Sequence, residues 1–184
     1  MADFPEQLGA GSHIGELGAG SFLFSTNALT DPNFMSTVIL ICQHSEDGSY
    51  GLVLNRPAHM PLSEIFNSVD KYKNQIRRVH IGGPVQGSEL QILQVSGEPA
   101  KGALEVVEGV YLGGYWDDLD KIIESDTRQI RLFLGYSGWG EGQLAEEIKM
   151  GGWEVYNADV KRVFTEEEDP WMQGLDAFKK KYFN

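Results

Sequence analysis

The chain has 184 residues, a length typical of one domain, and its 41% hydrophobic and 23% charged residues are ordinary for a globular protein. With 15 basic and 27 acidic residues, the net charge is −12. This charge argues against direct DNA binding and against attachment to an anionic membrane, because both need basic surfaces. The one broad basic segment, with Lys71, Lys73, Arg77 and Arg78, lacks a helix-turn-helix or zinc-finger pattern.

Cysteine content and the first residues indicate a cytoplasmic protein. Cys42 is the only cysteine, which excludes an intramolecular disulfide and a cysteine-rich metal site. A lone thiol suits a reducing compartment, and the sequence has neither a secretory signal nor a long apolar span. We expect no metal and no cofactor. Residues 1–20 are glycine-rich and predict a flexible arm ahead of a single domain at 21–184.

Short β-rich runs between turn residues predict the strands. In chain order they are Ser21–Ser25, Ser36–His44, Tyr50–Asn55, Arg78–Ile81, Glu89–Val95, Ala103–Leu112, Ile130–Tyr136 and Trp153–Tyr156. The runs Val38–Cys42 and Ile130–Leu134 are apolar on both faces, which is typical of central strands. Asp47-Gly48 lies between two of the runs and predicts a hairpin.

Helical spacing of apolar residues predicts fewer helices than strands. The expected helices are Pro61–Val69, Asp117–Ser125 with Asp117 as cap, Gly142–Met150, and Pro170–Tyr182 with Asp169 as cap. Asp31-Pro32 predicts a single helical turn through Phe34. Because strands outnumber helices and do not alternate regularly with them, the expected fold class is α+β with a mixed, largely antiparallel sheet.

Cys42 and His44 are two residues apart on a predicted strand and should therefore point to the same face. A thiol beside an imidazole can form a reactive pair. We favour a buried, unreactive thiol, because the hairpin places Cys42 opposite Gly51, Leu52 or Val53 and no third residue orients the imidazole.

Two short motifs favour structural roles. In Asn55-Arg56-Pro57, the proline should end the strand, and Arg56 could bind an anion or pair with one of the many acidic residues. Gly82-Gly83-Pro84-Val85 follows a strand and lacks the Lys and Ser/Thr of a phosphate loop, so it predicts a tight turn.

The most distinctive stretch runs from Gly135 to Leu144, and it predicts a glycine-rich turn between a strand and a helix. Such a turn either binds an anion with free N–H groups or is only a packed reversal, with at least one of its glycines at positive φ. It is not a nucleophile elbow, because the second glycine, Gly138, follows Ser137 one residue too early. We favour the structural interpretation, with Trp139 packed over the turn.

In this order, the motifs resemble the YqgE/AlgH family of bacterial proteins over roughly Gly20–Phe178. The matching pieces are Leu29-Thr30-Asp31-Pro32-Asn33-Phe34, Cys42-Gln43-His44 with Gly48 and Gly51, Asn55-Arg56-Pro57, Gly82-Gly83-Pro84-Val85, Gly135-Tyr136-Ser137-Gly138-Trp139, and Gly142-Gln143-Leu144 with Glu147. The resemblance implies a sheet bent into a partly open, barrel-like shape with helices outside. Some members are called transcriptional regulators, but the family brings neither catalytic residues nor a settled DNA-binding motif.

These observations favour a non-enzymatic regulatory or binding protein whose partner is another protein or a small anionic ligand. The candidate binding surface comprises His44, Asn55, Arg56, Ser137, Gly138, Trp139 and Gln143. The alternative is an enzyme that acts on a small anionic substrate near His44, Arg56 and the Gly138–Gly142 turn. The two hypotheses differ in one respect, since an enzyme needs titratable groups that converge in one cleft. The sequence leaves the oligomeric state open.

Overall fold

The computed structural model describes residues 15–125, 130–157, 160, 164, 175, 176, 179 and 180. The strands are β1 (Ser21–Ser25), β2 (Val38–Ser45), β3 (Gly48–Val53), β4 (Pro57–Pro61), β5 (Arg78–Ile81), β6 (Val85–Val95), β7 (Leu104–Val107), β8 (Val110–Leu112), β9 (Ile130–Gly140) and β10 (Trp153–Asn157). The helices are α1 (Leu62–Ile65), α2 (Trp116–Glu124) and α3 (Gln143–Lys149), with a 3-10 turn, η1, at Asp70–Tyr72. The predicted α+β class and largely antiparallel sheet are confirmed.

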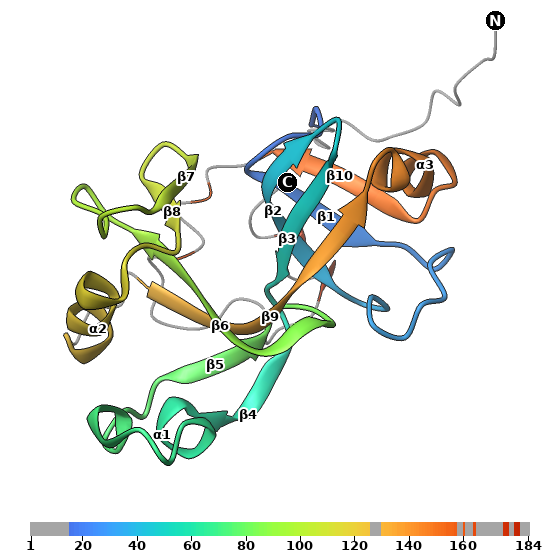
Figure 1. The fold of residues 1–184 in the computed structure, drawn as a ribbon. Helices are drawn as coiled ribbons and strands as arrows, with labels where there is room; N and C mark the ends of the chain where they lie inside the picture. Colours follow the sequence, from blue (N-terminus) through green and yellow to red (C-terminus); the bar gives the residue numbers. More distant parts are fainter. Residues whose placement is uncertain are drawn as a thin grey trace, which may run out of the picture.

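The sheet consists of two parts that share β9 (Figure 1). The hydrogen-bonded path runs β10-β1-β2-β3-β9-β6-β8-β7, while β4 and β5 lie off this path. We call β10, β1, β2, β3, the end of β9 and α3 the α3 half. We call β4 to β8, the start of β9, α1, η1 and α2 the α2 half. The parallel pairing of β5 with β9 makes the sheet mixed.

The sheet does not close into a barrel, because the path ends at β10 and β7 and these two strands do not pair. The sheet does bend, since a Cβ added to Gly20 beside β1 would lie 2.1 Å from Val107 Cγ1 on β7. Residues of both halves, including Phe24, Leu40, Leu93 and Phe133, therefore share one core. A second core lies under α1, η1 and α2, and a third lies under α3.

The two parts of the sheet meet at a bend in β9. Before the bend, β9 pairs with β5 and β6, and after it Ser137–Gly140 pair with β3. Gly135 has φ of +67°, and a Cβ there would lie 2.6 Å from the carbonyl oxygen of Gly83. Gly82 contacts β9 just as closely, 2.3 Å from the Gly135 oxygen by the same measure. Only glycine fits such an approach, so the predicted Gly82-Gly83 turn is confirmed as a structural crossing point.

The structure corrects several predicted boundaries. The run Ala103–Leu112 is a hairpin of β7 and β8 rather than one strand, and β4 was missed because its prolines predicted a stop. Prolines are tolerated there, since β4 pairs only with β5 and is an edge strand. The helix expected to reach Val69 ends at Ile65. Asp117 lies in the first turn of α2, and the residue before that helix is Tyr115.

Residues 15–20, which the sequence assigns to the arm, bond to the sheet. Gly15 N–H donates to the Val155 carbonyl at 3.0 Å, and Gly20 N–H donates to the Ile41 carbonyl at 2.7 Å. The rest of the predicted arm lies outside the described residues. Of the predicted helix Pro170–Tyr182, the structure describes 175, 176, 179 and 180, all helical. Among the described helices, none is long and apolar enough to cross a membrane.

Candidate functional site

His44 lies at the exposed end of β2, away from the thiol with which it was expected to share a face. A β-bulge between Ile41 and Gln43 breaks the alternation of side chains, so Cys42 is buried in the core while His44 is exposed. His44 Nδ1 is 2.7 Å from Ser49 Oγ across the confirmed hairpin. Burial raises the pKa of the Cys42 thiol well above its ordinary range. The reactive pair is therefore not formed.

Asn55 and Arg56 hold the loop between β1 and β2. Asn55 accepts the Val38 N–H and donates to the Ser36 carbonyl, both at 2.9 Å. The Arg56 guanidinium donates to carbonyls of the same loop, those of Asn33, Pro32 and Met35. Burial lowers the pKa of Arg56, and Asp31 partly opposes this shift. These carbonyls take the place of the anion that Arg56 was considered to bind.

Ser137 and Gly138 belong to β9 rather than to a turn. The strand was expected to end at Tyr136, but it continues to Gly140 because Ser137–Gly140 pair with β3. Ser137 is fully buried, and its hydroxyl donates to the Gly82 carbonyl at 3.1 Å. Of Gly138, Gly140 and Gly142, only Gly142 has positive φ, +67°, and it precedes α3. The predicted positive φ is confirmed at that one position.

Trp139 and Gln143 bond to a carboxylate on α3. Trp139 Nε1 donates to Glu147 Oε2 at 3.0 Å, and Trp153 Nε1 donates to the same oxygen at 2.8 Å. Gln143 donates to the other Glu147 oxygen at 3.0 Å. Phe34 packs on both indoles, with ring centroids 6.0 Å from Trp139 and 5.8 Å from Trp153. The loop that Arg56 holds thus covers the tryptophans, and α3 is fastened beside them.

The sequence-predicted surface does not converge on one cleft. His44 lines a shallow pocket of about 420 Å³ together with Ser49, Glu141 and Gly142, but neither Arg56 nor Ser137 lines it. The described residues contain no group of three or more His, Cys, Asp or Glu placed to hold a metal ion. The arrangement that the enzyme hypothesis requires is absent from this part of the described chain.

A larger groove, which sequence reasoning missed, lies in the α2 half. Its volume is about 580 Å³, within the range of ligand sites in proteins. Its walls come from the α1–η1 segment, the first part of β6, the turn after β8, and α2. The lining residues are Phe66, Tyr72, Ser88, Glu89, Leu90, Gln91, Ile92, Gly113, Gly114, Trp116 and Leu119.

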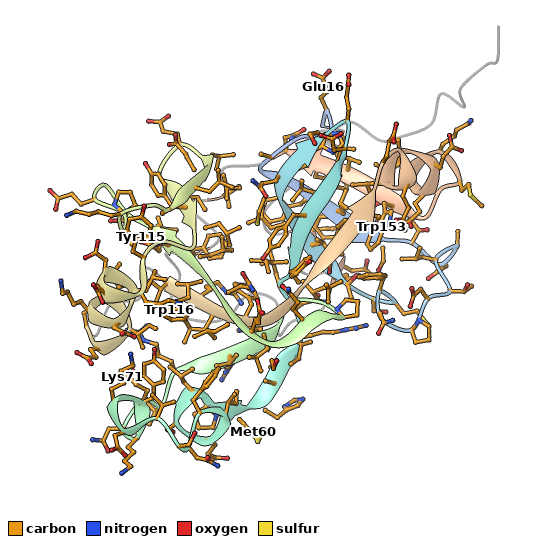
Figure 2. All side chains as sticks on the ribbon, viewed as in Figure 1. Glu16, Met60, Lys71, Tyr115, Trp116 and Trp153 are labelled. Atoms are coloured by element: carbon orange, nitrogen blue, oxygen red, sulfur yellow. The ribbon has the colours of Figure 1, made fainter. Side chains whose placement is uncertain are left out.

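Trp116 distinguishes this groove from the pocket at His44. The indole is 52% exposed although it lies against apolar neighbours, among them Phe66 and Leu119. In the view of Figure 2, Trp116 is labelled beside α2, with Tyr115 above it and Lys71 below it. Tyr115 is 67% exposed but does not line the groove. The signal in the sequence that could have indicated this groove is the pair of adjacent aromatic residues just ahead of the predicted helix cap, Asp117.

A carboxylate also fastens the groove's wall. Tyr72 donates its hydroxyl to Asp120 Oδ1 at 2.7 Å, and Lys71 pairs with the other Asp120 oxygen. Burial raises the pKa of Asp120, but the bonds from Lys71 and Tyr72 outweigh it, and the net pKa is below its ordinary value. These bonds therefore join the η1 turn to α2, two of the segments that line the groove.

Comparison with known proteins identifies the family. The family model described as AlgH-like matches residues 22–182, most of the chain. The chain belongs to the YqgE/AlgH family. A UPF0301 protein of Chlorobaculum tepidum is 36% identical over 160 residues, covering 85% of this chain and 84% of that protein. A UPF0301 protein of Chlamydia abortus is 36% identical over 165 residues, covering 89% and 87%.

Two solved structures share the fold of this chain. The solution structure of the AlgH protein from Pseudomonas aeruginosa matches with a TM-score of 0.67 at 26% identity, over 88% of this chain and 85% of that one. A crystal structure of a Corynebacterium diphtheriae protein matches with a TM-score of 0.68 at 24% identity, over 91% and 86%, which shows the fold alone. The family is uncharacterised, and its relatives assign no reaction to the site.

Proposed function

We propose that this YqgE/AlgH-family protein is a non-enzymatic binding protein that takes a polypeptide partner in the groove beside Trp116. The observation that carries the proposal is the half-exposed Trp116 indole over a groove of about 580 Å³. Tryptophan is enriched at the energetic centres of protein interfaces, where it enters well-packed sites. A regulatory role would then act through a bound partner rather than through DNA.

The groove supports binding better than catalysis. Its lining offers apolar side chains from Phe66, Leu90 and Leu119, with Glu89 as the one carboxylate among them. Enzyme sites typically gather several titratable groups in one cleft, whereas this lining offers Glu89 and the phenol of Tyr72, which is already bonded to Asp120. The lone, buried Cys42 supports a cytoplasmic setting, in which such a partner would be met.

The test is a selection of random dodecapeptides displayed on phage against the immobilised full-length chain, followed by fluorescence anisotropy on the enriched peptides. We expect micromolar binding that Trp116→Ala weakens at least tenfold. The matched control is Tyr115→Ala, because Tyr115 is a neighbouring exposed aromatic whose ring lies against Gly102 outside the groove. Both variants should keep the wild-type urea midpoint. Failure to enrich any peptide, or equal weakening by both variants, contradicts the proposal.

A further inference from the structure

We propose that the partner binds as an extended, basic peptide segment that adds a strand to the free edge of β6. This inference rests on the proposed binding function and specifies the partner's conformation and charge. Three features of the groove support it: an unpaired stretch of strand, an aromatic wall beside that stretch, and an excess of carboxylates.

The free edge results from unequal strand lengths. β6 runs for 11 residues, but β8 has only three and pairs with β6 no farther back than Leu93. The last bond on that side is from Gly113 N–H to the Ile92 carbonyl, at 2.8 Å. The chain then turns away at Gly113 and Gly114, both at positive φ, and enters α2. No other described strand lies on that side of β6.

Strand geometry determines which backbone groups face this edge. Along an antiparallel pair, successive residues direct their N–H and carbonyl groups to opposite sides. Ile92 directs its carbonyl away from β9 and toward Gly113. Leu90, two residues earlier, therefore presents its N–H and carbonyl on the same side. That side is open to the groove, because Leu90, its neighbours and Gly113 all line it.

An added strand would place its side chains against the groove's walls. Successive side chains of a strand point to opposite faces, so every second residue of the peptide would meet Trp116, Phe66 and Tyr72. Peptide recognition by strand addition works this way: main-chain bonds give affinity, and pockets for alternate side chains give specificity. The half-exposed Trp116 is positioned to cover one apolar side chain of such a peptide.

Charge favours a basic partner. Glu89 lines the groove and Asp117 follows Trp116, and neither forms an ion pair within the described part of the chain. Two cations of this region, Lys71 and Lys121, already pair with Asp120 and Asp118. With a net charge of −12 for the whole chain, lysine and arginine in the peptide would be attracted at long range as well.

The decisive experiment is a backbone N-methyl scan of the tightest peptide from the phage selection, measured against the full-length chain. Strand addition predicts losses of at least tenfold at every second residue and no loss at the residues between, which serve as internal controls. In parallel, amide exchange by NMR should slow at least tenfold at Leu90 on saturation with this peptide. The Gln91 amide, which faces β9, should not change.

The role of charge is tested with Glu89→Gln. This variant should bind the peptide three- to tenfold more weakly, and its binding should depend less on salt concentration. The control is Glu98→Gln, because Glu98 is an exposed carboxylate outside the groove. This variant should change neither the affinity for the peptide nor the salt dependence of binding. If peptides bind through Trp116 but tolerate N-methylation at every position, strand addition is wrong while the proposed binding function stands. The Leu90 amide could instead exchange slowly in the absence of peptide and faster when the protein is diluted. That result would show that a second copy of the chain covers the edge, and it would overturn the inference.

Discussion

A carboxylate holds each of the helices α3 and α2: Glu147 bonds α3 to the sheet, and Asp120 bonds α2 to the η1 turn. Glu147 on α3 receives two indole N–H groups, whereas Asp120 on α2 receives a tyrosine hydroxyl and an ammonium group. In the α3 half, Trp139 and Trp153 are only 5% and 3% exposed. In the α2 half, Trp116 is 52% exposed beside a groove.

The difference separates structural aromatics from one available for binding. The Trp139 indole N–H donates to Glu147 and Phe34 stacks on the ring, so this aromatic side chain is used within the fold. Around Trp116, apolar surface and the backbone of Leu90 remain accessible. The motif-rich half of this chain is thus the one whose described tryptophans are buried.

The largest effect is expected at the bend that joins the two halves. Gly135→Ala places a Cβ at φ +67°, 2.6 Å from the Gly83 oxygen and 2.7 Å from the Val85 oxygen. Because both contacts are backbone, the free energy of unfolding should fall by roughly 4 kcal/mol or more, measured by urea denaturation. Gly140→Ala on the same strand meets open space and should change it by less than about 0.5 kcal/mol. Equal losses would contradict the account of the bend.

The second-largest loss of stability is expected when the Glu147 carboxylate of the α3 half is removed. Glu147→Ala leaves two indole N–H groups without their acceptor in a nearly buried site, and the stability should fall by about 3 kcal/mol. Glu147→Gln keeps one side-chain oxygen, so its free energy of unfolding should fall by less. Glu146→Ala removes only an exposed pair with Lys149 and should lose about 0.3–0.5 kcal/mol. A Glu147→Ala variant as stable as Glu146→Ala would show that the indole bonds do not hold α3.

The carboxylate of the α2 half should contribute less and in a pH-dependent way. Asp120→Asn should lower the free energy of unfolding by about 1 kcal/mol at pH 7. The loss is small because Lys71 is nearly half exposed, and exposed ion pairs contribute little to stability. The Asp120 pKa lies below its ordinary value of 3.8, so its stabilisation is present above that pH and is lost as the pH falls through the lower, folded value. The difference between wild type and variant should therefore shrink below about pH 4. If the stability difference between wild type and Asp120→Asn grew as the pH fell, the folded pKa of Asp120 would be raised rather than lowered, which would contradict this prediction.

The smallest effect concerns the sole thiol, which lies in the core between the halves. Burial raises the pKa of Cys42, so native protein at pH 7 should react with Ellman's reagent only as fast as it opens. His44→Ala should not alter this rate, because the bulge keeps the two side chains apart. If Cys42 of the native protein were labelled within seconds, or if its labelling rate depended strongly on His44, the hypothesis of a reactive Cys42–His44 pair would be supported instead.

Most strands, the hairpin and the fold class could be predicted from the sequence, because each depends on local pattern. Alternating or continuous apolar runs specify β1, β5 and the core of β9, and Asp47-Gly48 specifies the turn between β2 and β3. Local pattern could not predict β4 or the extension of β9 to Gly140, since each depends on pairing with a distant strand. As a binding surface, the seven predicted site residues stay a prediction, and their contacts could not be predicted from the sequence because those depend on distant segments.

Tertiary structure alone decided what those residues do. Arg56 has the chemistry of an anion site, yet the loop at Pro32–Met35 supplies the acceptors. Trp116 looks in sequence like any aromatic residue at a helix start, but in the structure it is half exposed and lines the groove beside β6. The sequence determines which side chains can bind, by their hydrogen-bonding groups and apolar area. Only the packing of distant segments determines which of those groups are already satisfied and which remain accessible.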